Sequence, residues 1–490
     1  MLFNSVSYLA FLAVVTAGFW TLAPRWRQGL LLVASIVFYA LWRVEFVFLV
    51  VFSAFVDFFF SLKIYATEHP RRRLAYMLLS ISTNLGLLAY FKYTYFILGN
   101  VALLTGFPRE SFFAAVGHIV LPLGISFYTF LSISYTLDVY RREFTPVRSF
   151  SLYLTYVMFW PHMIAGPILR AHELIPQIAK PSRLNADDIG SGLRAILFGL
   201  FLKVALADQL APLVDEAFLT DAARLSGLDV LTMAFAFGLQ IYFGFAGYSM
   251  IAIGSARLVG VRFPENFNWP YLATSPREFW RRWHITLSSW IRDYLYLPLS
   301  GLHDRSHSTG GIDIQFVKSR DPVRVTAALF VTWFLMGLWH GASWNFAFWG
   351  LWHAGFILLY RLTNQGFEVI PARVRSFLGW GTTLLGVMLG WIFFRASSLS
   401  TAFILYGRLL HPANYLYLSF RENFYLIVAI ALLSMMGLRW LTVNRWLTVN
   451  RWFAADSPVR AVADVVAIAA ATFIVFIFLR PIGQFIYFQF

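Results

Sequence analysis

Long apolar stretches recur along the whole length of this chain, and the polar segments between them are mostly short. Typical runs cover residues 45–61, 75–97 and 377–394. A segment in lipid must satisfy its own backbone N–H and C=O groups, which a helix does within itself. We therefore predict an all-α polytopic membrane protein with about 11 to 13 membrane helices, at ~20 residues for each crossing.

Composition agrees with a chain that lies in a lipid bilayer. Hydrophobic residues make up 59% of the 490 residues and charged residues only 13%, whereas soluble domains average about 45–50% and about 25%. The formal net charge is +15, but the basic residues fall mostly in short loops between apolar runs. That distribution follows the positive-inside rule, so we expect no nucleic-acid partner.

The basic loops also predict an orientation. Arginines at 71–73 and 141–142 follow the third and fifth apolar runs, which places these loops in the cytoplasm and the N-terminus outside it. The first 20 residues carry no basic start, so we interpret them as a first membrane helix and not as a cleaved signal peptide. No domain boundary is evident over 1–490, and the one long polar stretch, 300–323, is a predicted loop.

The chain contains no cysteine. This excludes disulfides, cysteine metal sites and an acyl-enzyme linked through a thioester. The two loop histidines, His303 and His307, lack a nearby carboxylate cluster, so we expect neither a metal site nor a bound cofactor.

Residues 275–299 form the most informative segment of the sequence. Ser275 and Glu278 form a capping-box signature with Pro276 at the first helical position, which predicts one amphipathic helix. Its polar face, read at steps of three and four residues, contains Arg277, Arg281, His284, Ser288 and Arg292. Such a face can bind phosphate groups of a substrate, or it can meet anionic lipid headgroups as an ordinary interfacial helix.

His340 stands inside the apolar run FLMGLWHGASW. It is either a core histidine with satisfied hydrogen bonds or a neutral base beside a cavity. Asn345 follows closely and could orient the ring or polarise a carbonyl group. His353 lies thirteen residues further on, off the same helical face, so we expect it to serve packing. Asp57, also within an apolar run, is either functional or a helix-to-helix hydrogen-bond acceptor.

Two pieces, REFWRRWHITLSSWIRDYLYLPL at 277–299 and FLMGLWHGASWNFAFWGLWH at 334–353, resemble the membrane-bound O-acyltransferase family, together with PHMIAGPILR at 161–170. The resemblance covers about residues 120–400, and its nearer likeness is to the bacterial branch that O-acetylates alginate. It implies a catalytic core over 120–400, in a ring of helices around a central tunnel. It also implies that His340 is the catalytic histidine and His284 a second invariant polar position.

The resemblance further implies acyl transfer to a hydroxyl in the bacterial cytoplasmic (inner) membrane. The donor would be acetyl-CoA or an acyl carrier thioester, and the acceptor an extracytoplasmic polysaccharide or a partner acetyltransferase protein. Arg281 and Arg292 would bind the donor, with Ser288 and Asn345 as further binding residues, and His162 would line the tunnel or cap a broken helix. One alternative is a transporter or flippase. The other is an inactive relative, because Gly244 and Met250 stand where relatives commonly carry aspartate.

Overall fold

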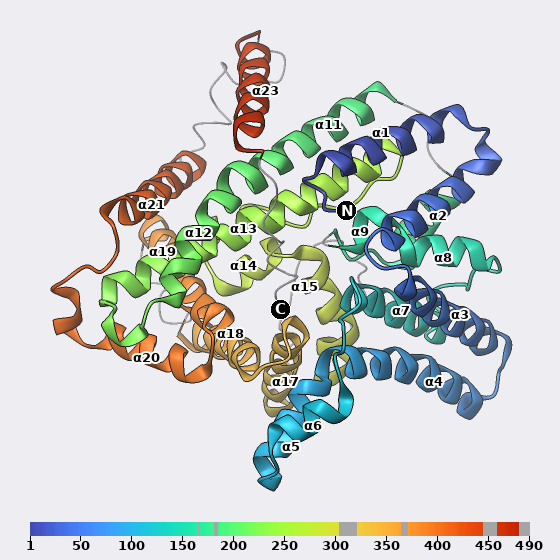
Figure 1. The fold of residues 1–490 in the computed structure, drawn as a ribbon, viewed down its shortest axis with the longest axis horizontal. Helices are drawn as coiled ribbons and strands as arrows, with labels where there is room; N and C mark the ends of the chain where they lie inside the picture. Colours follow the sequence, from blue (N-terminus) through green and yellow to red (C-terminus); the bar gives the residue numbers. More distant parts are fainter. Residues whose placement is uncertain (165, 181–184, 303–320, 364–370, 444–457, 480–490) are drawn as a thin grey trace. The chain divides into compact units, whose positions relative to one another are not determined.

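The structure is a computed structural model that describes residues 1–164, 166–180, 185–302, 321–363, 371–443 and 458–479. These residues form helices joined by turns, and no β-strand occurs in the described ranges (Figure 1). The prediction of an all-α chain is therefore confirmed. Most of the predicted polar loop over 300–323 lies outside the described residues.

The chain divides into two compact units. The first comprises Met1–Ile196 and Tyr248–Pro264, and the second comprises Leu197–Gly247 and Glu265–Phe490. Helices α11 and α13 contribute residues to both. The helices that begin in the first unit are α1 (Val6–Thr21), α2 (Pro24–Ala40), α3 (Glu45–Ala66), α4 (Pro70–Leu88), η1 (Ala89–Tyr93), α5 (Thr94–Thr105), α6 (Arg109–Val116), α7 (Ile125–Tyr140), α8 (Phe150–Met158), α9 (Trp160–Met163), α10 (Ala171–Ala179) and α11 (Ala186–Leu200).

The second unit contains the remaining helices. In chain order they are η2 (Phe201–Ala207), α12 (Asp208–Leu219), η3 (Ala222–Arg224), α13 (Gly227–Leu258), η4 (Pro270–Leu272), α14 (Pro276–Arg282), α15 (Ile285–Ile291), η5 (Arg292–Tyr296), α16 (Leu297–Ser300), α17 (Pro322–His340), α18 (Trp344–Thr363), α19 (Ala372–Arg395), α20 (Leu399–Leu410), η7 (Pro412–Tyr415), α21 (Glu422–Val443) and α23 (Pro458–Phe478).

Six helical segments among the described residues are long and apolar enough to cross a membrane. They are Glu45–Ala66, Pro70–Thr105, Ala186–Leu219, Gly227–Leu258, Pro322–His340 and Ala372–Arg395. Four shorter apolar helices, of 10–17 residues, accompany them. The chain is thus a multi-pass membrane protein, while the total of about 11 to 13 crossings stays a prediction.

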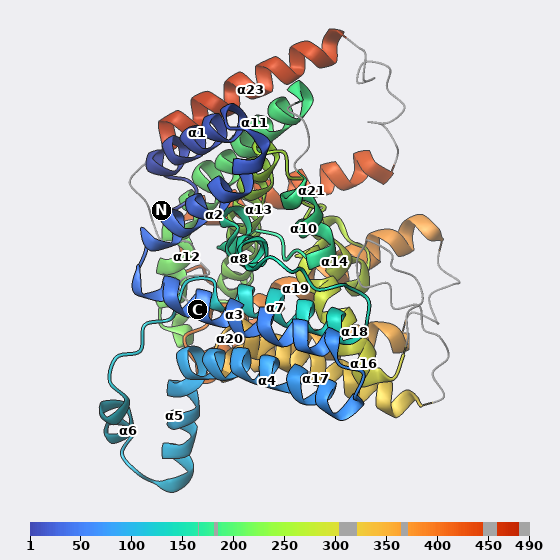
Figure 2. The same cartoon turned by 90° about the vertical axis from the view of Figure 1, so that its right-hand side faces the viewer.

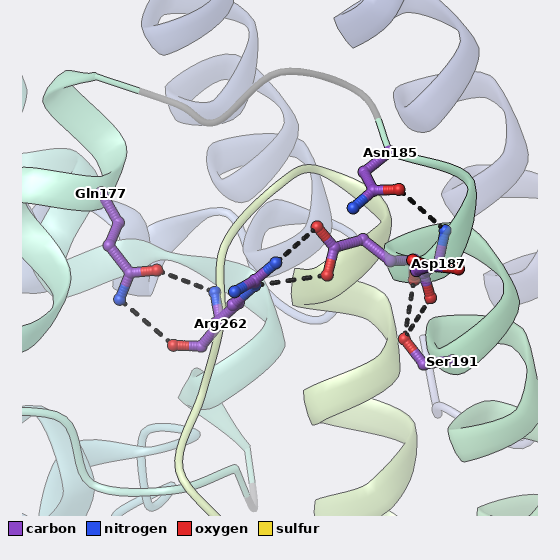
Figure 3. A network of polar contacts seen from close by, with 6 residues as sticks. Gln177, Asn185, Asp187, Ser191 and Arg262 are labelled. Atoms are coloured by element: carbon purple, nitrogen blue, oxygen red, sulfur yellow. Dashed lines mark hydrogen bonds and ion pairs between the residues drawn. The ribbon is translucent and has the colours of Figure 1, made fainter.

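In the first unit, α3, α4 and α7 lie side by side (Figures 1 and 2). A polar network ties the loop that leaves α13 to α10 and α11 (Figure 3). The Gln177 side chain exchanges two hydrogen bonds with the backbone of Arg262, at 2.8 and 3.1 Å. The guanidinium of Arg262 donates to both carboxylate oxygens of Asp188, at 3.2 and 3.0 Å. These contacts fix Arg262, at the start of the loop that also contains Asn266.

In the second unit, α17 and α18 pack closely because glycine lies at their contact (Figure 1). A Cβ atom on Gly337 would lie 2.1 Å from the carbonyl oxygen of Phe346, and one on Gly350 would lie 2.0 Å from that of Trp333. Both obstacles are backbone atoms, so they cannot move aside as a flexible side chain could. The glycines therefore set the distance between the two helices that carry His340 and His353.

Substitution Gly350→Ala should lower the unfolding temperature of the purified protein by several degrees. Overpacking of a tight contact costs about 1–3 kcal/mol, and here the new methyl group would meet backbone. The matched control is Gly355→Ala on the same helix, where a Cβ would have no neighbour within 4 Å. Because alanine favours helix over glycine, this control should leave the unfolding temperature unchanged or raise it. Equal effects of the two substitutions would contradict the packing argument.

Candidate active site

The segment predicted as one helix over 275–299 is broken in the middle. Its start is as predicted, because the Ser275 hydroxyl accepts a hydrogen bond from the Glu278 N–H at 3.1 Å and Pro276 occupies the first turn. Helix α14 then ends at Arg282, and α15 begins at Ile285. The prediction of a single amphipathic helix was therefore wrong, and the last part of the segment forms the separate short helix α16.

His284 stands at the break in the left-handed region, with φ 42° and ψ 56°. A residue with a side chain adopts this conformation at a cost of about 1–3 kcal/mol and keeps it only when its surroundings require it. Two interactions with Asn266 stabilise this backbone conformation of His284. The backbone carbonyl of Asn266 accepts from the Ile285 N–H at 2.9 Å, and its side-chain Oδ1 lies 3.1 Å from Nδ1 of His284.

The hydrogen bonds around Asn266 define the protonation of His284. The Oδ1 atom of Asn266 also accepts from the backbone N–H of Thr286 at 3.3 Å, which identifies it as the amide oxygen. Nδ1 of His284 must therefore carry the proton and donate it to Oδ1. The opposite nitrogen, Nε2, is then an acceptor when the ring is neutral, and it is buried without a hydrogen-bond partner among the described residues.

Burial lowers the pKa of His284 to about 3. The side chain is fully enclosed, with Phe245 at 4.6 Å and Phe267 at 6.3 Å between ring centroids. These aromatic neighbours offer no negative charge to an imidazolium. The neutral ring with a free Nε2 acceptor is thus the form present at neutral pH.

The rest of the predicted polar face is not a solvent-exposed stripe. Ser288 is buried and donates its hydroxyl hydrogen to the carbonyl of Trp283 at 3.1 Å. Arg292 is also buried, and its Nε donates to the Asp293 carboxylate at 2.5 Å. Arg281 stays half-buried at the end of α14. The break at His284 changes the helical phase, and it turns Ser288 and Arg292 toward the protein interior.

His340 is the last residue of α17 and is buried, with 6% of its surface exposed. Its ring contacts Trp339, Trp349 and Phe394, at centroid distances of 4.9, 5.0 and 5.4 Å. Gly341 ends the helix here. A Cβ at that position would lie 2.0 Å from the ring of Phe346. The glycine beside His340 thus allows close packing next to the imidazole.

Aromatic rings connect the two histidines within the second unit. Phe267 contacts both His284 and Trp283. Trp283 contacts Trp391 at 5.1 Å, Trp391 stacks on Trp349 at 5.9 Å, and Trp349 contacts His340. His284 and His340 therefore both contact one continuous cluster of aromatic rings.

Asn345 lies beside this cluster and is hydrogen-bonded to the end of α19. Its amide Nδ2 donates to the carbonyl of Ala396 at 2.6 Å, which fastens the first turn of α18 to the end of α19. Its predicted roles, orienting His340 or polarising a carbonyl group, stay predictions. Asn345 holds the helix that presents Trp349 to His340.

His353 is a residue whose surroundings the sequence did not reveal. It is fully buried among Trp280, Trp333 and Trp349, at centroid distances of 4.9, 5.6 and 5.0 Å. Both of its ring nitrogens are without hydrogen-bond partners among the described residues. Trp349 thus contacts His340 on α17 and His353 on its own helix, α18. The repeated Trp-His dipeptide in the sequence could have indicated that the two histidines share aromatic surroundings.

His162 belongs to the first unit. The apolar run is interrupted there as predicted, because α8 ends at Met158 and the four-residue α9 contains His162. Its ring is buried against Phe159 and Phe263, and Nε2 lies 3.4 Å from the carbonyl oxygen of Val157. Burial lowers the pKa of His162 to about 4. Its place along a tunnel stays a prediction.

The lowered pKa of His284 makes folding stability depend on pH. Below pH 6.5 the histidine binds a proton in the unfolded chain, where its pKa has the ordinary value near 6.5, but not in the folded site. Stability should therefore fall as pH is lowered from about 6.5 toward about 3. Asparagine tolerates the left-handed backbone, so His284→Asn is a suitable substitution. It should lower the slope of the unfolding free energy against pH by about 1.4 kcal/mol per pH unit. Unfolding midpoints at several pH values in detergent measure it.

The matched control for this measurement is His118→Asn, at an exposed position in a connecting segment. It should leave the wild-type slope unchanged. A slope that stays the same in His284→Asn would contradict the buried neutral ring.

The chain is similar to acyltransferases of bacteria. The model of the MBOAT, membrane-bound O-acyltransferase family, matches residues 78–312. A probable alginate O-acetylase of Azotobacter vinelandii is 38% identical, over 83% of this chain and 77% of that protein. A probable alginate O-acetylase of Pseudomonas putida is 36% identical, over 90% and 88% of the two chains.

The similarity extends to a relative that acts on a different polymer. The peptidoglycan O-acetyltransferase of Helicobacter pylori is 33% identical, over 82% of this chain and 78% of that protein. The family-model match includes His284 but ends before His340, while the pairwise matches cover most of the chain. With these relatives and its buried histidine motifs, the chain belongs to the membrane-bound O-acyltransferase family and is a multi-pass membrane O-acyltransferase.

Proposed function

We propose that this protein transfers an acetyl group from a cytoplasmic thioester to a hydroxyl group of an extracytoplasmic polysaccharide, or to a partner acetyltransferase protein that completes the transfer. Support comes from the relatives, which include a probable alginate O-acetylase and a peptidoglycan O-acetyltransferase. Both of these acceptors contain sugar hydroxyl groups. Acetyl-CoA is the proposed donor, and a carrier-protein thioester is its alternative.

The position of His340 is the observation that carries this proposal. A buried imidazole at the C-terminal end of α17 is next to the partial negative charge of the helix dipole. That dipole favours a positive charge by about 0.3–1 kcal/mol, and by up to ~2 kcal/mol when the site is partly buried. The ring can therefore accept a proton during the reaction and be stabilised while it carries it.

In the proposed reaction, His340 removes the proton from the acceptor hydroxyl as its oxygen attacks the thioester carbonyl carbon. A C–O bond forms, and the tetrahedral intermediate then breaks the C–S bond. The proton on His340 passes to the departing thiolate, so the products are an O-acyl ester and a free thiol. With no cysteine in the chain, this direct route needs no thioester-linked acyl-enzyme.

His284 is proposed to bind a hydroxyl or thiol hydrogen through its Nε2 acceptor. The hydrogen bond to Asn266 holds the ring in one tautomer and one orientation. This arrangement suits a group that positions a reactant. Its shared aromatic cluster with His340 supports their assignment to one site.

The donor's phosphates are proposed to bind at Arg281, which is half-buried at the end of α14. The ion pair of Arg292 with Asp293 makes that arginine a poorer phosphate ligand. We propose that Arg292 and Ser288 position the segment around His284. A tunnel open to both sides, an extracytoplasmic N-terminus and an inner-membrane location belong to the same proposal.

The decisive experiment uses the full-length protein in nanodiscs with radiolabelled acetyl-CoA. Substitution His340→Ala should reduce thioester consumption by about 10²–10⁴-fold, the usual contribution of a positioned general base. The mutant should still elute as the wild type does, because a smaller side chain adds no charge. His69→Ala, at an exposed position, is the matched control and should keep full activity.

Undiminished consumption in a folded His340→Ala protein would assign the base elsewhere. If wild-type protein consumes no acetyl-CoA, the same assay with an acyl carrier-protein donor, and then with a polysaccharide acceptor added, tests the other donor. Failure with every donor would contradict the proposed transfer.

A further inference from the structure

A buried polar cluster in the first unit is centred on Asp57 of α3. Asp57 Oδ1 accepts hydrogen bonds from the Ser80 hydroxyl at 2.6 Å and from the Asn84 amide at 2.7 Å, both on α4. Ser80 also lies 3.0 Å from the Thr136 hydroxyl on α7. Each of these four side chains is 0 or 1% exposed. The carboxyl group thus joins three helices, as the helix-to-helix interpretation of Asp57 predicts.

The other carboxyl oxygen is different. Asp57 Oδ2 is buried and has no hydrogen-bond partner among the described residues. Five hydroxyl oxygens from α3, α7 and α8 share this property, and they belong to Ser61, Tyr128, Thr129, Ser132 and Tyr153. A buried hydroxyl without a partner normally costs about 1–3 kcal/mol, so six such oxygens in one group of packed helices require an explanation.

Three of these hydroxyl-bearing side chains lie near the carboxyl group. Ser132 lies next to both Asp57 and Tyr153, although its hydroxyl meets hydrogen-bond geometry with neither. Tyr128 and Tyr153 are near enough to Asp57 to interact with it electrostatically. Ser61 is one helical turn after Asp57, on the same side of α3. Ser132, Tyr128 and Tyr153 therefore lie near the carboxyl group, and none of these three hydroxyls is bonded to another.

The charge of the cluster limits what can occupy it. The side chains that interact with Asp57 among the described residues are hydroxyls and an amide, not a lysine or arginine. An ionised carboxylate buried without a counter-charge costs many kcal/mol. One carboxylate surrounded by neutral oxygens matches a single positive charge, whereas calcium sites contain several carboxylates and magnesium retains waters. Hydroxyl and carboxylate oxygens are hard ligands, which suit a hard cation.

We infer that α3, α4, α7 and α8 enclose a binding site for a monovalent alkali cation, with Asp57 Oδ2 as its charged ligand and the surrounding hydroxyls as neutral ones. The Ser80 and Asn84 bonds fix the carboxyl group through Oδ1 and leave Oδ2 unbonded. None of the residues of this site is one that the proposed acyl transfer uses. Cation binding would stabilise the folded form in proportion to occupancy.

The test compares unfolding temperatures of the purified full-length protein in sodium, potassium and choline chloride at equal ionic strength and at pH 8. Choline serves as the reference cation because its methylated nitrogen cannot be coordinated by oxygen ligands as a bare alkali ion is. A saturable rise of several degrees with sodium or potassium, relative to choline, is the expected result for the wild type. Direct binding of radioactive sodium to protein in detergent should reach about one ion per chain.

Three variants make the assignment specific. Asp57→Asn keeps an acceptor for Ser80 but removes the charge, so the alkali-cation response should disappear. Ser132→Ala keeps the carboxylate and should raise the half-saturating concentration about tenfold, the factor that corresponds to one ~1.4 kcal/mol interaction. The matched control is Thr83→Ala on α4, whose hydroxyl bonds to the Leu79 carbonyl within its own helix. It should respond as the wild type does.

The inference fails if wild-type protein unfolds at the same temperature in all three salts and retains no radioactive sodium. That result would mean a protonated Asp57 with trapped water in the cluster. It also fails if a folded Asp57→Asn protein keeps the full response. If Asp57→Asn does not fold, Ser132→Ala and the binding stoichiometry of the wild type still decide the question.

Discussion

A polar side chain among apolar helices has no water to bond, so it must find partners in the protein or remain unsatisfied. The polar chemistry of this protein follows from that constraint. Asp57 satisfies one oxygen with Ser80 and Asn84, and His284 satisfies one nitrogen with Asn266. In both cases one atom of the group is bonded and its opposite atom is not. The bonded atom fixes the orientation, which leaves the other atom available for chemistry.

Hydropathy was sufficient to predict the fold class, because long apolar runs in lipid have little choice but helix. Local signals were also reliable where the interaction is local. Ser275 caps α14 as its spacing predicts. The break at His284 could not be predicted in this way, since its cause is a backbone and side-chain interaction with Asn266, 18 residues earlier in the chain. Helical periodicity assumes one continuous helix, and it therefore placed Ser288 and Arg292 on one polar face with Arg281, whereas Ser288 and Arg292 are buried and Arg281 is half-buried.

The same assumption explains the interpretation of His353. Thirteen residues separate it from His340, which excludes a shared face only if both lie on one helix. The turn after Gly341 places them on α17 and α18, and Trp349 contacts both rings. The glycines that allow this approach, Gly337 and Gly350, are visible in the sequence, but their contact partners are not. Resemblance to a family indicated a role for His340 and could not supply its surroundings.

The two histidines differ in how well each can hold a proton, and that difference supports their separate assignments. A proton on Nε2 of His284 would create a charge whose one bonded partner is the neutral amide of Asn266, in a setting that already lowers the pKa to about 3. A proton on His340 would instead lie at the C-terminus of α17, where the helix dipole is negative. A general base must become charged during the reaction, whereas a positioning group need not. The helix terminus therefore favours His340 as the base and His284 as the acceptor that orients a reactant.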